Sequence, residues 1–127
     1  MWNYRCYDDG RTPSLWQRWY DQNKDKRGTH DSVFRMLEQQ KQWTNTVHTK
    51  IFDKNNGIIE VRLTGNPKHR ILGFYGEAQR EFVILGTCTH KQHVYDPPSI
   101  RKTVVSRKKE ILENKLKAQV CVRPSTA

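Results

Sequence analysis

The sequence predicts an α+β fold, in which an antiparallel sheet of about four strands follows two helices and precedes a third. Three observations predict it. Apolar residues recur at helical spacing between positions 13 and 43, alternate with polar residues from position 50 to 91, and return to helical spacing after Pro97 and Pro98. Because 127 residues are a usual size for one domain, we expect a single domain spanning residues 1–127.

The N-terminal third begins with a strand and continues with two helices. Aromatic and polar residues alternate in "MWNYRCY", which indicates a short first strand. Thr12 is a candidate N-cap with Pro13 in the first helical position, and Gly28 is expected to end this helix. A second helix is then expected to begin at Thr29 or Asp31. Two amphipathic helices with a short connection predict a helical hairpin.

The strands follow from Lys50 onward. The segments "KIF", "IIEVRL", "HRILGFY" and "EFVILGTCTHK" are separated by turn signals such as Asn56-Gly57. Their short connections favour an antiparallel meander. Asp96 is a candidate cap for the last helix, and "QVCVRPSTA" is expected to form a short strand or to fray. We expect the helices to cover one face of the sheet and to leave the other free for basic residues.

Charge is the strongest compositional signal. Lysine and arginine number 23 against 13 acidic residues, a formal net charge of +10, which favours a polyanionic partner such as nucleic acid, an acidic protein or an anionic membrane. The sequence contains neither a membrane-spanning apolar run nor a signal-peptide pattern, so we expect a cytoplasmic protein. Cys6, Cys88 and Cys121 are odd in number and far apart, and we expect them to be reduced thiols.

Two arginines are candidates for phosphate binding. Arg62 and Arg70 flank one tight turn, so they are expected to be neighbours across a hairpin, at the surface of the sheet. Two guanidinium groups on one sheet face can donate in planar forks to phosphate oxygens. The alternative is that both are solvated or pair with Glu60 or Glu81.

The segment "CTHKQHVYDPP" holds further candidates. Cys88, His90 and His93 are zinc-ligand types, but a second ligand cluster is missing, so we expect no metal site. Cleavage of RNA by its own 2′-hydroxyl needs a proton acceptor, cations around the phosphate and a donor for the leaving oxygen. These groups are offered by His90, Lys91, His93 and Tyr95. The alternative is a polar loop whose side chains face water.

Other residues suit RNA binding. Tyr75, Tyr95 and Trp43 are candidates for stacking on unpaired bases, with core packing as the alternative. Further RNA contacts are expected at Lys68, His69, Tyr75 and Arg107. Arg107 belongs to the basic run "RKTVVSRKKE", which a solvated helix face also explains.

The block from Ile58 to Glu110 resembles the RelE/HigB-type toxin superfamily, in its phage-derived HigB-like branch. The likeness rests on "IIEVRL", "HRILGFY" and "EFVILGTCTHKQHVYDPPSIRKTVVSRKKE" in succession. It implies a RelE-like fold and the toxin of a type II toxin–antitoxin pair. Such a toxin cleaves mRNA in the ribosomal A site without a metal or a small-molecule cofactor, and a cognate antitoxin protein inhibits it.

The resemblance also implies site positions. Glu60 and Arg62 match the first strand of the pattern, Arg70 the second, His90-Lys91 a lysine pair, and Pro97 the proline before the last helix. The sequence departs from the pattern where His90 replaces a lysine and where "QHVYDP" is one residue longer. Two alternatives remain open: a non-enzymatic toxin that inhibits a protein such as DNA gyrase, and a basic nucleic-acid-binding protein without toxicity. The His/Lys/Tyr cluster favours the enzyme, because a pure binder has less need of it.

Overall fold

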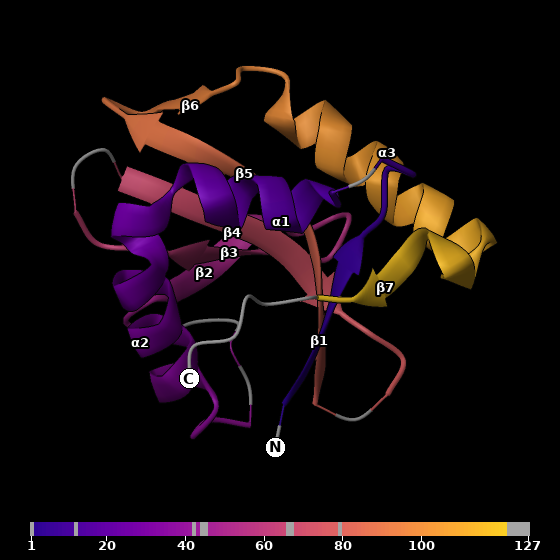
Figure 1. The fold of residues 1–127 in the computed structure, drawn as a ribbon, viewed down its shortest axis with the longest axis horizontal. Helices are drawn as coiled ribbons and strands as arrows, with labels where there is room; N and C mark the ends of the chain where they lie inside the picture. The colour runs from indigo at the N-terminus through magenta and orange to yellow at the C-terminus, as the bar shows by residue number, and fades with distance from the viewer. Residues whose placement is uncertain are drawn as a thin grey trace.

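A computed structural model describes residues 2–11, 13–41, 43, 46–65, 68–78 and 80–121 (Figure 1). Its strands are β1 (Asn3–Tyr7), β2 (Thr49–Asp53), β3 (Ile58–Arg62), β4 (Lys68–Tyr75), β5 (Glu81–Lys91), β6 (Val94–Asp96) and β7 (Ala118–Val120). Its α-helices are α1 (Leu15–Gln22), α2 (Arg27–Leu37) and α3 (Ile100–Glu113), with 3-10 turns at Lys24–Lys26 and Lys115–Lys117.

The sheet is larger than the sequence predicts. The expected sheet of about four antiparallel strands is wrong, because the structure has a seven-stranded mixed sheet in the order β2-β3-β4-β5-β1-β7, with β6 added to β5. β1 runs parallel to β5, and β7 pairs antiparallel with β1. The partners of these short strands lie far away in the sequence. A local hairpin signal therefore cannot predict the β1–β5 and β1–β7 pairs.

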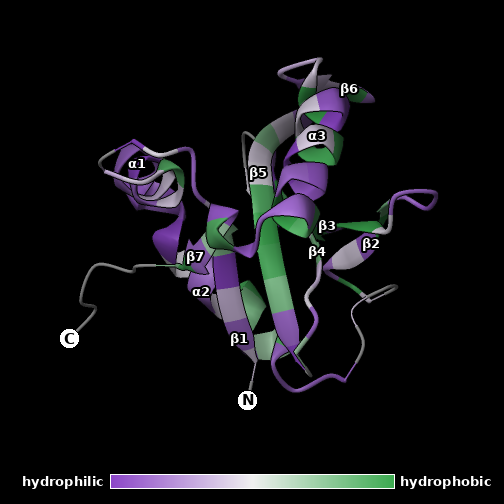
Figure 2. Ribbon diagram, turned by 90° about the vertical axis from the view of Figure 1, so that its right-hand side faces the viewer, coloured by the Kyte–Doolittle hydropathy of each residue, from purple (hydrophilic) through white to green (hydrophobic). Residues whose placement is uncertain are grey.

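Both faces of the sheet are covered, so the expectation of one free face is wrong. One face packs against α1 and α2 through a cluster that includes Trp16, Phe34, Val61 and Ile84. The other face packs against α3, and Figure 2 shows α1 and α3 on opposite sides of β5. In the described residues, no helix has both the length and the apolar content that a bilayer crossing requires.

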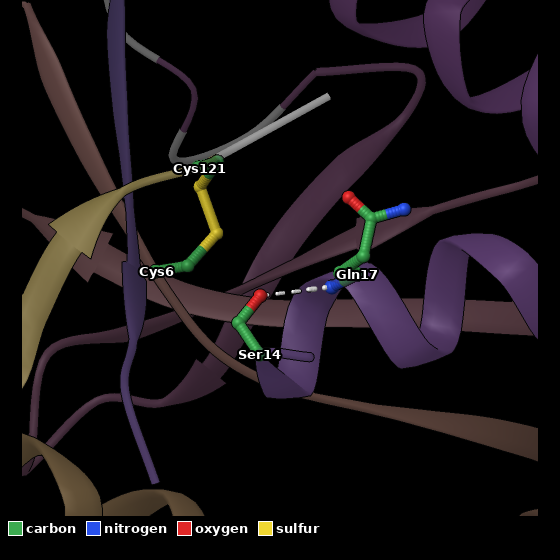
Figure 3. The surroundings of a disulfide bond; sticks show 4 residues. All are labelled: Cys6, Ser14, Gln17 and Cys121. Atoms are coloured by element: carbon green, nitrogen blue, oxygen red, sulfur yellow. Dashed lines mark hydrogen bonds between the residues drawn. A yellow bond between two sulfur atoms is a disulfide. The ribbon is translucent and has the colours of Figure 1, made fainter. Parts of the chain in front are cut away.

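The helices begin at other residues than predicted. Ser14 caps α1, since its Oγ accepts a hydrogen bond from the Gln17 amide (3.2 Å; Figure 3); the predicted cap Thr12 lies outside the described residues. Gly28 lies inside α2, because one glycine costs a helix only about 1 kcal/mol and the buried face of α2 outweighs it. Asp96 belongs to β6, and α3 begins only after Ser99.

Two of the cysteines are paired. Cys6 in β1 forms a disulfide with Cys121, with a Cα–Cα distance of 5.2 Å (Figure 3). The prediction of three reduced thiols is therefore wrong for this pair and right for Cys88, which is free and buried. The two paired cysteines are 115 residues apart in the chain, and only the β1–β7 pairing brings them together.

Candidate functional site

A buried carboxylate organises the polar residues on the α3 face of the sheet. Arg62 in β3 lies directly opposite Arg70 in β4, which confirms the expected juxtaposition. Glu60 is 0% exposed and stands two residues before Arg62 on the same face. Arg62 Nε donates to Glu60 Oε2 (3.0 Å), and Arg70 Nε lies 3.4 Å from the same oxygen. Two neighbouring strands thus direct both guanidinium groups at one carboxylate.

β6 brings an aromatic pair to the same carboxylate. The Tyr95 hydroxyl donates to Glu60 Oε1, and the Tyr95 ring stacks on His90 with centroids 4.3 Å apart and an interplanar angle of 14°. The stack forms because His90 and Tyr95 are opposite each other in the β5–β6 register. We call Glu60, Arg62, Arg70, His90 and Tyr95 the Glu60 cluster.

The segment expected to be a loop between strand and helix is a tight hairpin. Lys91 pairs with Val94, so Gln92 and His93 alone form the turn, and both have positive φ values, 51° and 66°. Turns of this kind favour Asn-Gly, so Gln92-His93 carries no recognisable hairpin signal. The turn returns His93 toward His90, with 6.4 Å between the ring centroids.

The environment sets the protonation of the two rings. Burial, reinforced by the positive charge of Arg70, lowers the pKa of His90 below its ordinary value of 6.5, so its imidazole is neutral at pH 7. Burial and the hydrogen bond to Glu60 raise the pKa of Tyr95, which keeps the phenol protonated. The cluster therefore holds a neutral imidazole beside a phenol whose proton is directed at Glu60.

The two arginines differ in how much of each can reach a ligand. Arg70 is only 7% exposed, and its Nη1 donates to the His69 carbonyl (3.0 Å). The expectation of a surface position is therefore wrong for Arg70. The side chain of Arg62 is 38% exposed although it pairs with Glu60. The alternative that both arginines pair with Glu60 is confirmed, and Arg62 is the one that still faces solvent.

Two exposed lysines extend the positive charge. In the register of the sheet, Lys50 lies opposite Glu60 and Lys68 lies opposite His90. Cross-strand partners share a face, so both lysines border the Glu60 cluster. Lys68 was a predicted RNA contact, whereas sequence reasoning missed Lys50 and treated Glu60 only as an ion-pair partner and a matching position of the family pattern. Lys50 could have been found from the hairpin at Asn56-Gly57, because the register of that hairpin places Lys50 opposite Glu60.

Other predicted site residues lie apart from the cluster. His69 is buried on the opposite face, with its ring edge-on to Trp19 at 6.0 Å. Lys91 follows His90 in β5 and so points to the opposite face as well. Tyr75 lies at the far end of β4, where its hydroxyl accepts a hydrogen bond from the Trp43 amide (2.5 Å). Trp43 is fully buried, so core packing is the correct alternative for it.

Arg107 serves the packing of α3. Its Nη1 donates to the Leu85 carbonyl (2.9 Å), and its guanidinium lies over the Tyr7 ring at 4.9 Å from the centroid. Burial lowers the pKa of Arg107 from its ordinary value, though not enough to remove its charge at neutral pH. Arg107 is therefore directed at β5 and β1 and is not grouped with the Glu60 cluster.

Cys88, His90 and His93 are the residues of zinc-ligand type near this site. Among the described residues, no group of three or more His, Cys, Asp or Glu side chains is placed to hold a metal ion. Burial raises the pKa of the Cys88 thiol to about 12, so it is protonated at neutral pH.

No protein-family model, no curated protein and no solved structure matches the chain.

Proposed function

We propose that the chain is an endoribonuclease toxin of a type II toxin–antitoxin pair, which acts in the cytoplasm on ribosome-bound mRNA. The Glu60 cluster carries this proposal. It combines a neutral imidazole, a phenol and two guanidinium groups around one buried carboxylate, with exposed lysines beside it. The sequence resemblance to RelE/HigB-type toxins and the net charge of +10 are consistent with it.

The proposed reaction breaks the P–O5′ bond as the 2′-oxygen attacks the phosphorus. His90 accepts the proton of the 2′-hydroxyl, which its lowered pKa permits at neutral pH. The exposed His93, on the turn beside it, donates a proton to the departing 5′-oxygen. Arg62, with Lys50 and Lys68 at the border, stabilises the charge on the phosphate. The products carry a 2′,3′-cyclic phosphate and a 5′-hydroxyl.

Glu60 and Tyr95 are positioning residues in this scheme. Glu60 fixes both guanidinium groups and the phenol, and the stacked Tyr95 ring holds the imidazole of His90. A buried carboxylate between two arginines also limits how much positive charge reaches the phosphate. For that reason binding without cleavage, by a non-enzymatic toxin or a basic nucleic-acid-binding protein, is the second candidate.

The test is purified protein added to translating ribosomes with end-labelled mRNA. We expect cuts within codons, ends with 2′,3′-cyclic phosphate, and loss of cutting in His90→Asn and Arg62→Ala. Lys102→Ala is the matched cation control, because Lys102 is exposed on α3. Intact mRNA with arrested translation or inhibited DNA supercoiling would instead establish the second candidate. Cutting by Arg62→Ala at the wild-type rate would refute the assignment of the site.

Induction in bacteria tests the toxin itself. We expect growth to stop together with loss of intact mRNA, and to resume when the neighbouring antitoxin gene is expressed. Growth that continues with the wild-type chain, at a level where the protein is detectable, would contradict toxicity.

A further inference from the structure

A cavity lies along the edge of β5 that pairs with β1 and β6, between α1 and α3. It has a volume of about 270 Å³, near the lower limit of small-molecule sites. Figure 2 shows α1 and α3 on opposite sides of β5, and residues of both helices line the cavity. Its lining is largely apolar and aromatic and includes Trp16, Trp19, Thr87, Pro97, Ile100 and Thr103.

The wall formed by β5 is an interrupted sheet edge. β1 pairs with β5 as far as Ile84, and β6 pairs with it only from Thr89 onward. In the described part of the chain, residues 85–88 therefore have no strand partner on this edge. Because both flanking strands end at the gap, a continuous extended peptide has no room to run through it, whereas a compact group fits.

Thr87 presents an unused donor and an unused acceptor at this gap. The His69 carbonyl accepts from the Leu63 amide (3.0 Å), so the polar groups of His69 and Ile71 face β3. Thr87 is the β5 partner of Ile71, and its own N–H and C=O consequently point away from β4 and into the gap. They make no hydrogen bond to any described residue.

A second unpaired donor belongs to a side chain that lines the cavity, although the donor atom itself is enclosed. Trp16 lines the cavity, is 3% exposed, and its indole Nε1 finds no partner among the residues described. A buried N–H without an acceptor is costly. Trp16 is stacked on Trp19 at 4.9 Å and 14°, so the donor belongs to a flat aromatic wall.

We propose that this cavity binds an unpaired RNA nucleobase. Every base offers a flat face for an indole wall, and each has an edge with a donor beside an acceptor, which matches the N–H and C=O of Thr87. Arg107, which lines the cavity and remains charged, favours the attached phosphate.

The inference deepens the proposed function and rests on it, because the occupant is a base of the RNA that the Glu60 cluster cuts. Pro97 connects the two sites: it lines the cavity and directly follows β6, which carries Tyr95. Since Thr87 matches the edges of all four bases, the cavity anchors the strand without selecting one base through this contact.

The experiment titrates the full chain with adenosine, guanosine, cytidine and uridine. Binding is followed by tryptophan fluorescence and by NMR of the Thr87 amide and the Trp16 indole N–H. We expect saturable quenching, with the largest shifts at these two groups. Thr103→Phe, which fills the cavity, should weaken nucleoside binding at least tenfold. Thr103→Val is the control and should preserve binding, because valine has nearly the size of the threonine that it replaces. Trp16→Phe, which keeps a ring but removes the donor, should weaken it less than Thr103→Phe.

The outcomes separate the two proposals. Nucleoside binding that Thr103→Phe abolishes, in a protein that cuts no RNA, supports the cavity and refutes the cleavage. Cleavage by a protein whose Thr87 and Trp16 signals do not move with any nucleoside overturns the cavity alone. Shifts produced by a short peptide and by no nucleoside also overturn it. If Thr103→Phe fails to fold, the NMR shifts of Thr87 and Trp16 in the wild-type protein decide whether the cavity binds a nucleoside.

Discussion

The two faces of the sheet use polar residues differently, as His69 and Arg70 show in adjacent positions of β4. His69 is buried under α1 beside Trp19, and burial lowers its pKa, so it is a neutral member of the core. Arg70 points to the α3 face and keeps its charge beside Glu60. One step along a strand therefore separates a structural histidine from a member of the candidate site.

The extent of helical cover explains the difference. α1 and α2 bring aromatic side chains over most of their face of the sheet. α3 packs mainly against β5 and β4. The part of this face around Glu60 is bordered by Lys50, Arg62 and Lys68 instead. Arg62 and Arg70 are tolerated there because both pair with Glu60, and the side chain of Arg62 still reaches water.

The largest effect is expected from Glu60→Ala. It leaves Arg70 buried without its carboxylate, and removing one partner of a buried pair costs on the order of 3–5 kcal/mol of unfolding free energy. Urea denaturation measures the loss. Glu60→Gln, which keeps an acceptor, should lose less. A loss below about 1 kcal/mol for Glu60→Ala would show that Arg70 does not depend on Glu60.

Ile84→Ala probes the other face. Ile84 is buried in the cluster under α1 and α2, and truncation of such a residue costs about 2–5 kcal/mol. Urea denaturation should show this loss with the slope unchanged. Ile51→Ala is the matched control, because Ile51 is exposed at the edge strand β2. Equal losses for the two variants would contradict the assignment of Ile84 to the core.

The sequence was informative where the signal is local. The four strands from Thr49 to Lys91 follow from alternation, and the Arg62–Arg70 contact follows from one tight turn. The parallel pairing of β1 with β5 and the Cys6–Cys121 disulfide depend on residues far apart in the chain. Alternation within a single strand does not identify such partners.

The candidate site was predictable only in part for the same reason. Arg62, Arg70, His90 and Tyr95 were expected and do come together. The central position of Glu60 was not predicted, because it depends on the burial of its carboxylate between two arginines. That burial depends on what covers the sheet. His69 and Arg107 were misplaced because composition does not tell which face of an element is covered.

Arg62→Ala should separate activity from stability on the α3 face. Its half-exposed guanidinium is the accessible cation of the Glu60 cluster, so we expect roughly 100–1,000-fold slower RNA cleavage. The free energy of unfolding should change far less than in Glu60→Ala, because Tyr95 still donates to the carboxylate and Arg70 remains paired with it. If the variant cuts RNA at the wild-type rate but unfolds more easily, Arg62 has a structural role, like the polar residues of the opposite face.

The pH dependence of cleavage should report His90. Its pKa lies below 6.5, and only the neutral ring accepts a proton. Activity is therefore retained as pH falls to 6.5 and is lost only below the lowered pKa of His90, by about tenfold per pH unit once the pH is under that pKa. Initial rates measured from pH 5 to 8 check this. Loss of activity that begins well above 6.5 would exclude His90 as the acceptor.

The smallest effect is expected from Glu77→Ala. Glu77 pairs with Lys115 at 2.8 Å, but both side chains are more than two-thirds exposed, at 75% and 71%. Lys115 lowers the pKa of Glu77 mainly through their hydrogen bond, and water and salt screen such a pair. We expect the urea midpoint to stay within measurement error, with or without added salt. A clear shift here would mean that exposed pairs matter in this protein too, and that burial does not set Glu60 apart.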